Sequence, residues 1–273
     1  MVAVSEVSGA GASGFPPKGL WGILLMPGEA SVPHTRFMDT TSVYEAHVTA
    51  LTESLGFRQF ESGRLTKDQY DRFILNVGRT HTKSPQLLAF LFSMAPPAAA
   101  ASIRGNMLEE LGVADELGQA HPALLEQLLH GAGLAHRSAD IRGLAEMDMR
   151  RLVTESLLYE SLAQVGLAAM IEVTAFEYML SRVADRMATA LATHRGLSAH
   201  AIEWFTHHGS VDIGHAATGV RNIETYVEYY AIDDHDATTI LEIAMRENAF
   251  IKRYFADVTT ALVATTLVIE PAR

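Results

Sequence analysis

The chain has 273 residues, a length that allows one large domain or two small ones. It is 48% hydrophobic and 19% charged, enough for a sizeable core, which excludes wholesale disorder and a fibrous repeat. Acidic residues outnumber Lys and Arg by 32 to 21, and the net charge of −11 argues against a nucleic-acid-binding surface. The chain has no cysteine, which excludes disulfides, thiolate nucleophiles and cysteine-ligated clusters, so any metal needs His and carboxylate ligands.

The first part of the chain, residues 1–33, is rich in Gly and Pro and predicts a mobile arm. Its apolar stretch at residues 20–26 is short and follows no charged region, which argues against a signal peptide. No run approaches the ~18 apolar residues of a membrane helix. We therefore expect residues 34–273 to form a single domain of a cytoplasmic protein with neither membrane nor nucleic acid as partner, and a homodimer is compatible with the sequence.

From Thr40 onward, apolar residues recur at intervals of three and four, between short clusters of Gly, Pro, Asp and His. This pattern predicts helices and gives no strand signal. The short connections favour antiparallel neighbours in one all-α bundle. The predicted helical segments are residues 41–60, 66–80, 83–94, 97–111, 122–131, 138–146, 149–193, 198–229 and 236–268.

The segment 149–193 carries an apolar stripe that contains one carboxylate, Glu172. Steps of four and three along the stripe give Leu158, Leu162, Val165, Ala169, Glu172, Phe176, Met179 and Val183. An isolated ionised carboxylate is unfavourable there, so Glu172 needs a cation or strong donors opposite it. A buried Arg or Tyr partner and a metal ion both satisfy this requirement. Glu155 is the weaker alternative, whereas Glu160 and Glu177 are expected on a solvated face.

The segment 198–229 carries His208, Asp212 and His215 at spacings i, i+4 and i+7, which places all three on one helix face. Two imidazoles and a carboxylate are ligands that iron, manganese or zinc accept. A partly exposed His and Asp face with internal hydrogen bonds is the alternative. His207 points about a quarter turn away and is not expected to be a ligand.

A further candidate carboxylate, Glu110, ends the segment 97–111. Glu110 is expected to face inward, whereas adjacent Glu109 is rotated by about 100° and is expected in solvent. His121 directly precedes Pro122, which is typical of the first turn of a helix. We therefore expect His121 at a helix start, with His130 on the same segment as its competitor.

Taken in order, these residues resemble the haem-oxygenase-like di-iron oxidases. In that family a Glu is followed by a His, then by a Glu on a long core helix, and then by His-x-x-x-Asp-x-x-His on the next helix. The ordered match extends from Glu110 to His215, and the helical layout covers roughly residues 40–268. No Glu-x-x-His pair occurs on these helices, which disfavours a ferritin-like site.

The resemblance implies an all-α haem-oxygenase-like bundle of about seven or more helices, two Fe(II)/Fe(III) ions and O2 as co-substrate. It implies oxidation of a small molecule, favouring an amino acid undergoing desaturation, C–C cleavage or N-oxygenation in a specialised biosynthetic pathway. A fatty-acid decarboxylase or desaturase, and a non-catalytic metal-binding scaffold, are the alternatives. Candidate anchors for a substrate carboxylate are Arg104, Arg221 and Arg246. The implied metal ligands are Glu110, His121, Glu172, His208, Asp212 and His215, with Glu172 as the bridging, catalytic carboxylate.

Overall fold

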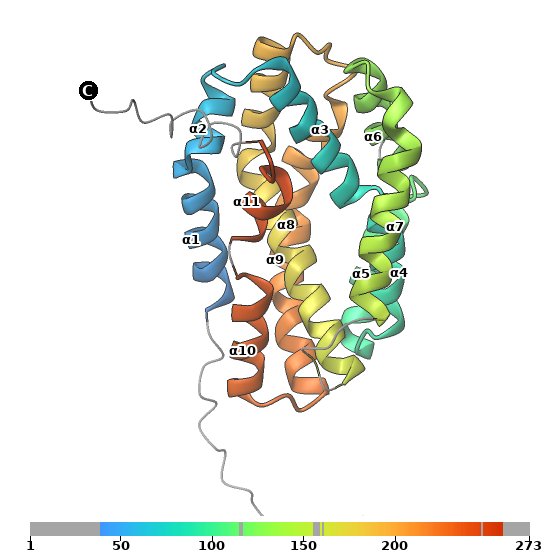
Figure 1. The fold of residues 1–273 in the computed structure, drawn as a ribbon. Helices are drawn as coiled ribbons and strands as arrows, with labels where there is room; N and C mark the ends of the chain where they lie inside the picture. The colour runs from blue at the N-terminus through green and yellow to red at the C-terminus, as the bar shows by residue number, and fades with distance from the viewer. Residues whose placement is uncertain (1–38, 115–116, 155–158, 160, 247, 259–273) are drawn as a thin grey trace, which may run out of the picture. The chain divides into compact units, whose positions relative to one another are not determined.

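The computed structural model describes residues 39–258 apart from 115–116, 155–158, 160 and 247, and the predicted arm of residues 1–33 lies outside them. The described residues form an all-α bundle with no strand among them (Figure 1), which confirms the predicted fold class. Within this part of the chain, no helix combines the length and the apolar character that crossing a membrane requires. The α-helices are α1 (Thr40–Glu53), α2 (Leu55–Glu61), α3 (Lys67–His81), α4 (Ser84–Ser93), α5 (Pro97–Glu110), α6 (His121–Gly131), α7 (Ser138–Thr154), α8 (Leu162–Ala190), α9 (Glu203–Tyr229), α10 (Asp234–Ala244) and α11 (Ala249–Tyr254).

Three segments predicted as single helices are divided in the structure by capping residues. The first breaks at Ser54, whose side chain accepts a hydrogen bond from the N–H of Phe57 at 3.2 Å and so starts α2. The long central segment breaks before Ser161, which caps α8 through the N–H of Gln164. The last segment breaks at Asn248, which has a φ of 48° and caps α11. Short polar side chains of this kind start helices that apolar periodicity alone does not separate.

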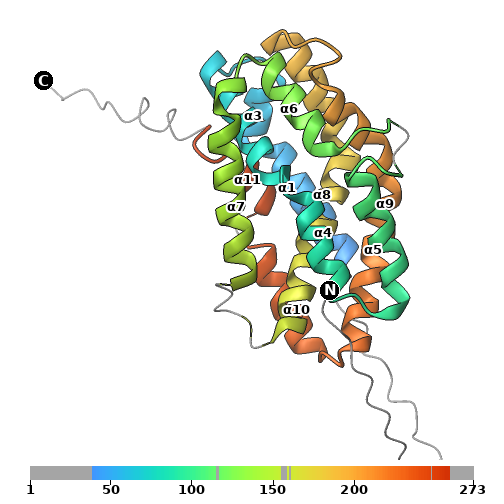
Figure 2. The ribbon, with the colours of Figure 1, turned by 90° about the vertical axis from the view of Figure 1, so that its right-hand side faces the viewer.

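Helix α8 lies at the centre of the bundle, with α9 packed along it (Figures 1 and 2). It also contacts α1, α2, α4, α7 and α10. Four consecutive residues, Phe176, Glu177, Tyr178 and Met179, are all buried. Because successive helical residues point about 100° apart, this burial means that neighbours cover α8 on every side there. A polar group in this stretch of α8 therefore meets other helices and not bulk water.

The close approach of α8 and α9 depends on Gly219, where an added Cβ would overlap the side chain of Thr174. We expect Gly219→Ala to destabilise the protein by about 1–3 kcal/mol, because overpacking pushes the two helices apart. Gly214→Ala is the matched control, since it lies on the same helix and its added Cβ meets no described atom within 4 Å. Urea unfolding measures both changes, and equal free energies of unfolding would contradict a tight contact.

Candidate metal centre

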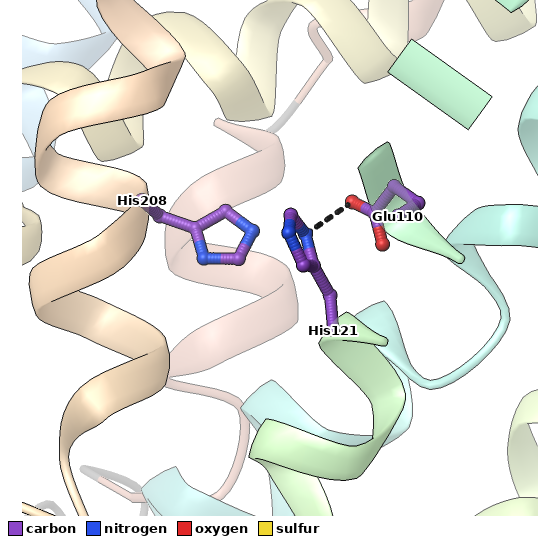
Figure 3. Close-up of side chains that lie close together, drawn as sticks. All are labelled: Glu110, His121 and His208. Carbon is purple, nitrogen blue, oxygen red and sulfur yellow. Dashed lines mark ion pairs between the residues drawn. The ribbon is translucent and has the colours of Figure 1, made fainter. Parts of the chain in front are cut away.

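Glu110, His121 and His208, here called the first cluster, converge in the interior of the bundle (Figure 3). Glu110 ends α5, His121 begins α6, and His208 lies on α9. One ligand atom from each residue lies within 4.8 Å of the other two. The His121 ring lies between the other two side chains, with Nδ1 3.2 Å from Glu110 Oε1 and a ring-centroid distance of 4.7 Å to His208. Two imidazoles and a carboxylate at this spacing can hold a metal ion.

The connection between α5 and α6 brings Glu110 and His121 together. Gly112 has a φ of 71°, and a Cβ at this position would meet backbone atoms of the returning loop at 2.5 Å. Glycine permits both the conformation and the close approach. His121 then opens α6 with 2% exposure, whereas His130 is exposed near the other end of the same helix. The structure thus places His121, and not its competitor, at the cluster.

The orientation of His208 leaves one ring nitrogen able to bind a metal. Its Nδ1 lies 2.7 Å from the carbonyl oxygen of Trp204, and because a carbonyl only accepts, Nδ1 carries the proton. Burial, aided by the charge of His121, lowers the pKa of His208 well below its usual value. The ring is therefore neutral at neutral pH, and Nε2 presents the lone pair with which imidazole binds metals.

Glu110 keeps its negative charge although it is buried. Burial acts to raise the pKa of Glu110, but the hydrogen bond and charge of His121, together with the hydroxyl of Ser84, lower it to about 2. Ser84 Oγ donates to Glu110 Oε2 at 2.5 Å and so fixes the carboxylate. An ionised carboxylate beside two imidazoles gives the first cluster donors that can bind a cation.

Glu177, Asp212 and His215, here called the second cluster, lie near the first. His215 Nδ1 is 3.3 Å from Asp212 Oδ1, and its Nε2 is 2.7 Å from Glu109 Oε2. Glu177 Oε1 accepts a hydrogen bond from the side-chain amide of Asn106 at 2.6 Å. The charges of Asp212 and His215 both act on Glu177. Two acids and an imidazole therefore share one buried region.

The second cluster retains protons. Burial raises the pKa of Glu177 to about 8 and that of Asp212 to about 6, and the charge of Glu110 acts in the same direction on both. Burial acts to lower the pKa of His215, but its hydrogen bond to Asp212 and the charge of Glu177 raise it to about 10. Since metal ligands must be deprotonated, a cation at the second cluster would have to displace these protons.

Asp212 gives a separate indication of a cation. Its side chain is 2% exposed, and Oδ2 accepts no hydrogen bond from the described residues. A buried carboxylate oxygen is costly without a partner. Asp212 lies one helical turn from both His208 and His215 on α9, so it links the two clusters. Nitrogen and oxygen donors of this kind fit iron.

Glu172, the one carboxylate in the apolar stripe, forms an ion pair and belongs to neither cluster. Its Oε1 is 2.5 Å from a terminal guanidinium nitrogen of Arg253. An Arg or Tyr partner was one of the two possibilities that the sequence analysis left open, the other being a metal ion. Glu177, expected on a solvated face, is instead 9% exposed and belongs to the second cluster. The expectation for Glu177 was wrong because neighbours cover α8 on all sides around this residue, so the buried surface there is wider than one stripe. The other acids considered, Glu155 and Glu160, lie outside the described residues.

Two residues set aside in the sequence analysis also contact the clusters. Glu109, expected in solvent, has a side chain 34% exposed and pairs with His215. His207 Nε2 lies 3.2 Å from His121 Nε2. Helical spacing placed both off the inward face, but α9 packs against α5 and α6 as well as α8. The density of His and acidic residues around positions 106–121 and 207–215 was the signal that could have found them.

A cavity adjoins both clusters, with an empty volume of about 920 Å³ when the space open to solvent is included. Glu110 and His208 of the first cluster line it, as do Glu177 and Asp212 of the second. Such a cavity gives a small molecule access to the centre. Apolar side chains contribute much of the remaining wall: Leu87, Leu88, Met149, Leu152, Val173, Phe176 and Leu180.

An all-α bundle with buried His and carboxylate groups beside a cavity defines a class of helical metal-site proteins. The profile of a family described as iron-containing redox enzymes matches residues 71–250, a range that includes both clusters. The chain belongs to this haem-oxygenase-like family. No curated protein matches the chain.

Proposed function

We propose that the protein is an O2-dependent oxidase that holds two iron ions and oxidises a small organic molecule. The first cluster would hold one ion and the second cluster the other. The observation that best supports this proposal is the juxtaposition of the two clusters beside one cavity, in a family of iron-containing redox enzymes. The same donors could hold an ion without turnover, so a non-catalytic metal-binding scaffold is the alternative.

The surrounding residues hold the ligands in position. When bound, Fe(II) would supply the electrons that reduce O2, and no side chain of this cysteine-free chain can replace it in that role. The Trp204 carbonyl fixes the His208 tautomer, and the Ser84 hydroxyl fixes Glu110. Asn106 donates to one oxygen of Glu177 and so orients that carboxylate. These hydrogen bonds pre-arrange the donors before any ion binds.

An amino acid is the substrate that we favour, with desaturation, C–C cleavage or N-oxygenation as the reaction. A cavity wall with both apolar and charged side chains suits a molecule with a charged head and an apolar body. A fatty acid, decarboxylated or desaturated at the same centre, is the alternative substrate. The three anchors named from the sequence, Arg104, Arg221 and Arg246, are all exposed, and Arg246 lines an adjoining basin.

Anaerobic titration with Fe(II), followed by mixing with O2, tests this proposal. We expect about two equivalents of Fe(II) per chain and O2 consumption that accelerates with a suitable amino acid. Chelated, metal-free protein is the control and should consume no O2. Iron binding without O2 consumption, over a panel of amino acids and fatty acids, would favour the scaffold instead.

A further inference from the structure

The cavity beside the clusters adjoins a second, outer basin, with an empty volume of about 1260 Å³ including open solvent. Both hollows share Thr80 and four charged residues, here called the rim: Arg79, Asp148, Glu172 and Arg253. A molecule that passes from the outer basin to the clusters therefore passes the rim. The charged residues of the rim are therefore placed to select such a molecule.

The rim contains two ion pairs of different strength. Arg79 binds Asp148 through two hydrogen bonds, of 2.6 and 2.8 Å, that occupy both carboxylate oxygens. Arg253 binds Glu172 through one hydrogen bond, of 2.5 Å, among the described residues. A guanidinium carries five N–H donors and a carboxylate two oxygens, so the second pair keeps capacity for further partners. The Arg253 and Glu172 side chains are also 38% and 24% exposed, so a ligand can reach them.

The charge balance of the Arg253–Glu172 pair favours a zwitterion over a simple acid. A carboxylic acid that bound Arg253 would compete with Glu172 and bring a second negative charge beside it. An α-amino acid also brings an ammonium group, which gives Glu172 a new partner while Arg253 holds the carboxylate. One ion pair then becomes two, and no charge is left unbalanced.

The inner cavity differs from the rim in character, because apolar side chains such as Leu87, Leu152 and Val173 also line it. A ligand held at the rim by its charged head would place an apolar body along this wall. The outer basin adds Arg246 and Lys252, which favour approach by a molecule bearing a carboxylate.

We propose that Arg253 and Glu172 form a binding site for the α-carboxylate and α-ammonium groups of an amino acid whose apolar side chain extends into the inner cavity. This inference rests on the proposed function, because it concerns the substrate of that same centre. It assigns Glu172 to substrate binding and not to metal binding.

Isothermal titration of the full-length, Fe(II)-loaded protein under anaerobic conditions tests the site without turnover. The probes are L-norleucine, L-leucine, L-methionine and L-phenylalanine, each with its deaminated acid and its decarboxylated amine. We expect at least one amino acid to bind at least about tenfold more tightly than both of its truncated partners, since each loses one charge-assisted contact. An acid that binds as tightly as its amino acid, or no binding by any of the four, overturns the proposal.

Glu172→Gln and Arg253→Gln separate head-group binding from a structural ion pair. Glu172→Gln releases Arg253, so the amino acid should lose about tenfold in affinity while the deaminated acid gains. Arg253→Gln should have the converse effect, with tighter binding of the amine. The matched control is Glu61→Gln, which breaks a remote Arg–carboxylate pair with Arg186 and should change no affinity. A uniform loss for all probes would indicate a structural pair and overturn the proposal.

Iron content, measured on the same samples, distinguishes this inference from the proposed function. Amino-acid binding that follows the expected pattern in protein that does not bind iron would contradict the proposed function alone. Two bound iron ions with no preference for the zwitterion would contradict the rim assignment alone.

Discussion

Replacing His121 with Ala is expected to remove one of the two iron ions that we propose and to abolish the proposed O2-dependent turnover. His121 supplies one imidazole of the first cluster and contacts both Glu110 and, through its ring, His208. Loss of a hydrogen bond to a metal ligand typically weakens metal binding by about 10- to 100-fold. Loss of the ligand itself should weaken iron binding by more than this. Anaerobic Fe(II) titration, with O2 uptake on the same samples, measures both effects.

His130→Ala is the matched control for this experiment, because it removes the same side chain from the same helix. His130 is exposed and distant in sequence from the helix start that carries His121. We expect its iron content and turnover to equal those of the unmodified protein. Two bound ions in His121→Ala and one in His130→Ala would refute the first cluster as a metal site.

The sequence predicted the parts of the site that depend on one helix. His208, Asp212 and His215 share α9, so their spacing alone brings them to one face. His121 was predicted at a helix start because Pro122 favours the first turn, and α6 begins there. These expectations needed only local geometry, which a sequence contains.

Local helical geometry could not show which of the two acids on α8, Glu172 or Glu177, lies with the clusters. The two residues are five positions apart on α8, or about 140° around the helix, so each faces a different set of neighbours. Glu177 faces Asn106 on α5, whereas Glu172 faces Arg253 on α11. Both partners lie far away in the chain, and helical periodicity contains no information on which helix covers which side of α8.

The same reasoning explains why the rim was missed. Its ion pairs join α3 to α7 and α8 to α11, and neither pair has a local spacing that would reveal it. Asn248, which starts α11, orients the helix that carries Arg253. A cap that apolar periodicity did not predict therefore helps to place the residue to which we assign the substrate carboxylate.

Glu177→Gln and Glu172→Gln are expected to have opposite effects on iron. Glu177 lies with Asp212 and His215, and an amide is a much weaker iron ligand than a carboxylate, so Glu177→Gln should lose the second ion and turnover. Glu172→Gln should keep both ions, because its carboxylate pairs with Arg253 at the rim. Iron titration of the two variants measures this difference. Loss of an ion in Glu172→Gln alone would return the bridging role to Glu172.

The metal-free protein offers an independent test of Glu177 through the pH dependence of its stability. The pKa of Glu177 is about 8 in the folded protein against a usual value of 4.5, so the folded state binds the proton more tightly than the unfolded state. This contribution to stability is complete below the unfolded pKa and is lost as the pH rises through the folded pKa. Gln resembles the protonated carboxyl group and can still accept a hydrogen bond from Asn106. The free energy of unfolding of Glu177→Gln, relative to that of the unmodified protein, should therefore rise by on the order of a few kcal/mol between about pH 5 and pH 9. Urea unfolding at both pH values, with chelator present, measures this gain, and parallel pH profiles for the two proteins would show that Glu177 ionises as an ordinary, solvated acid.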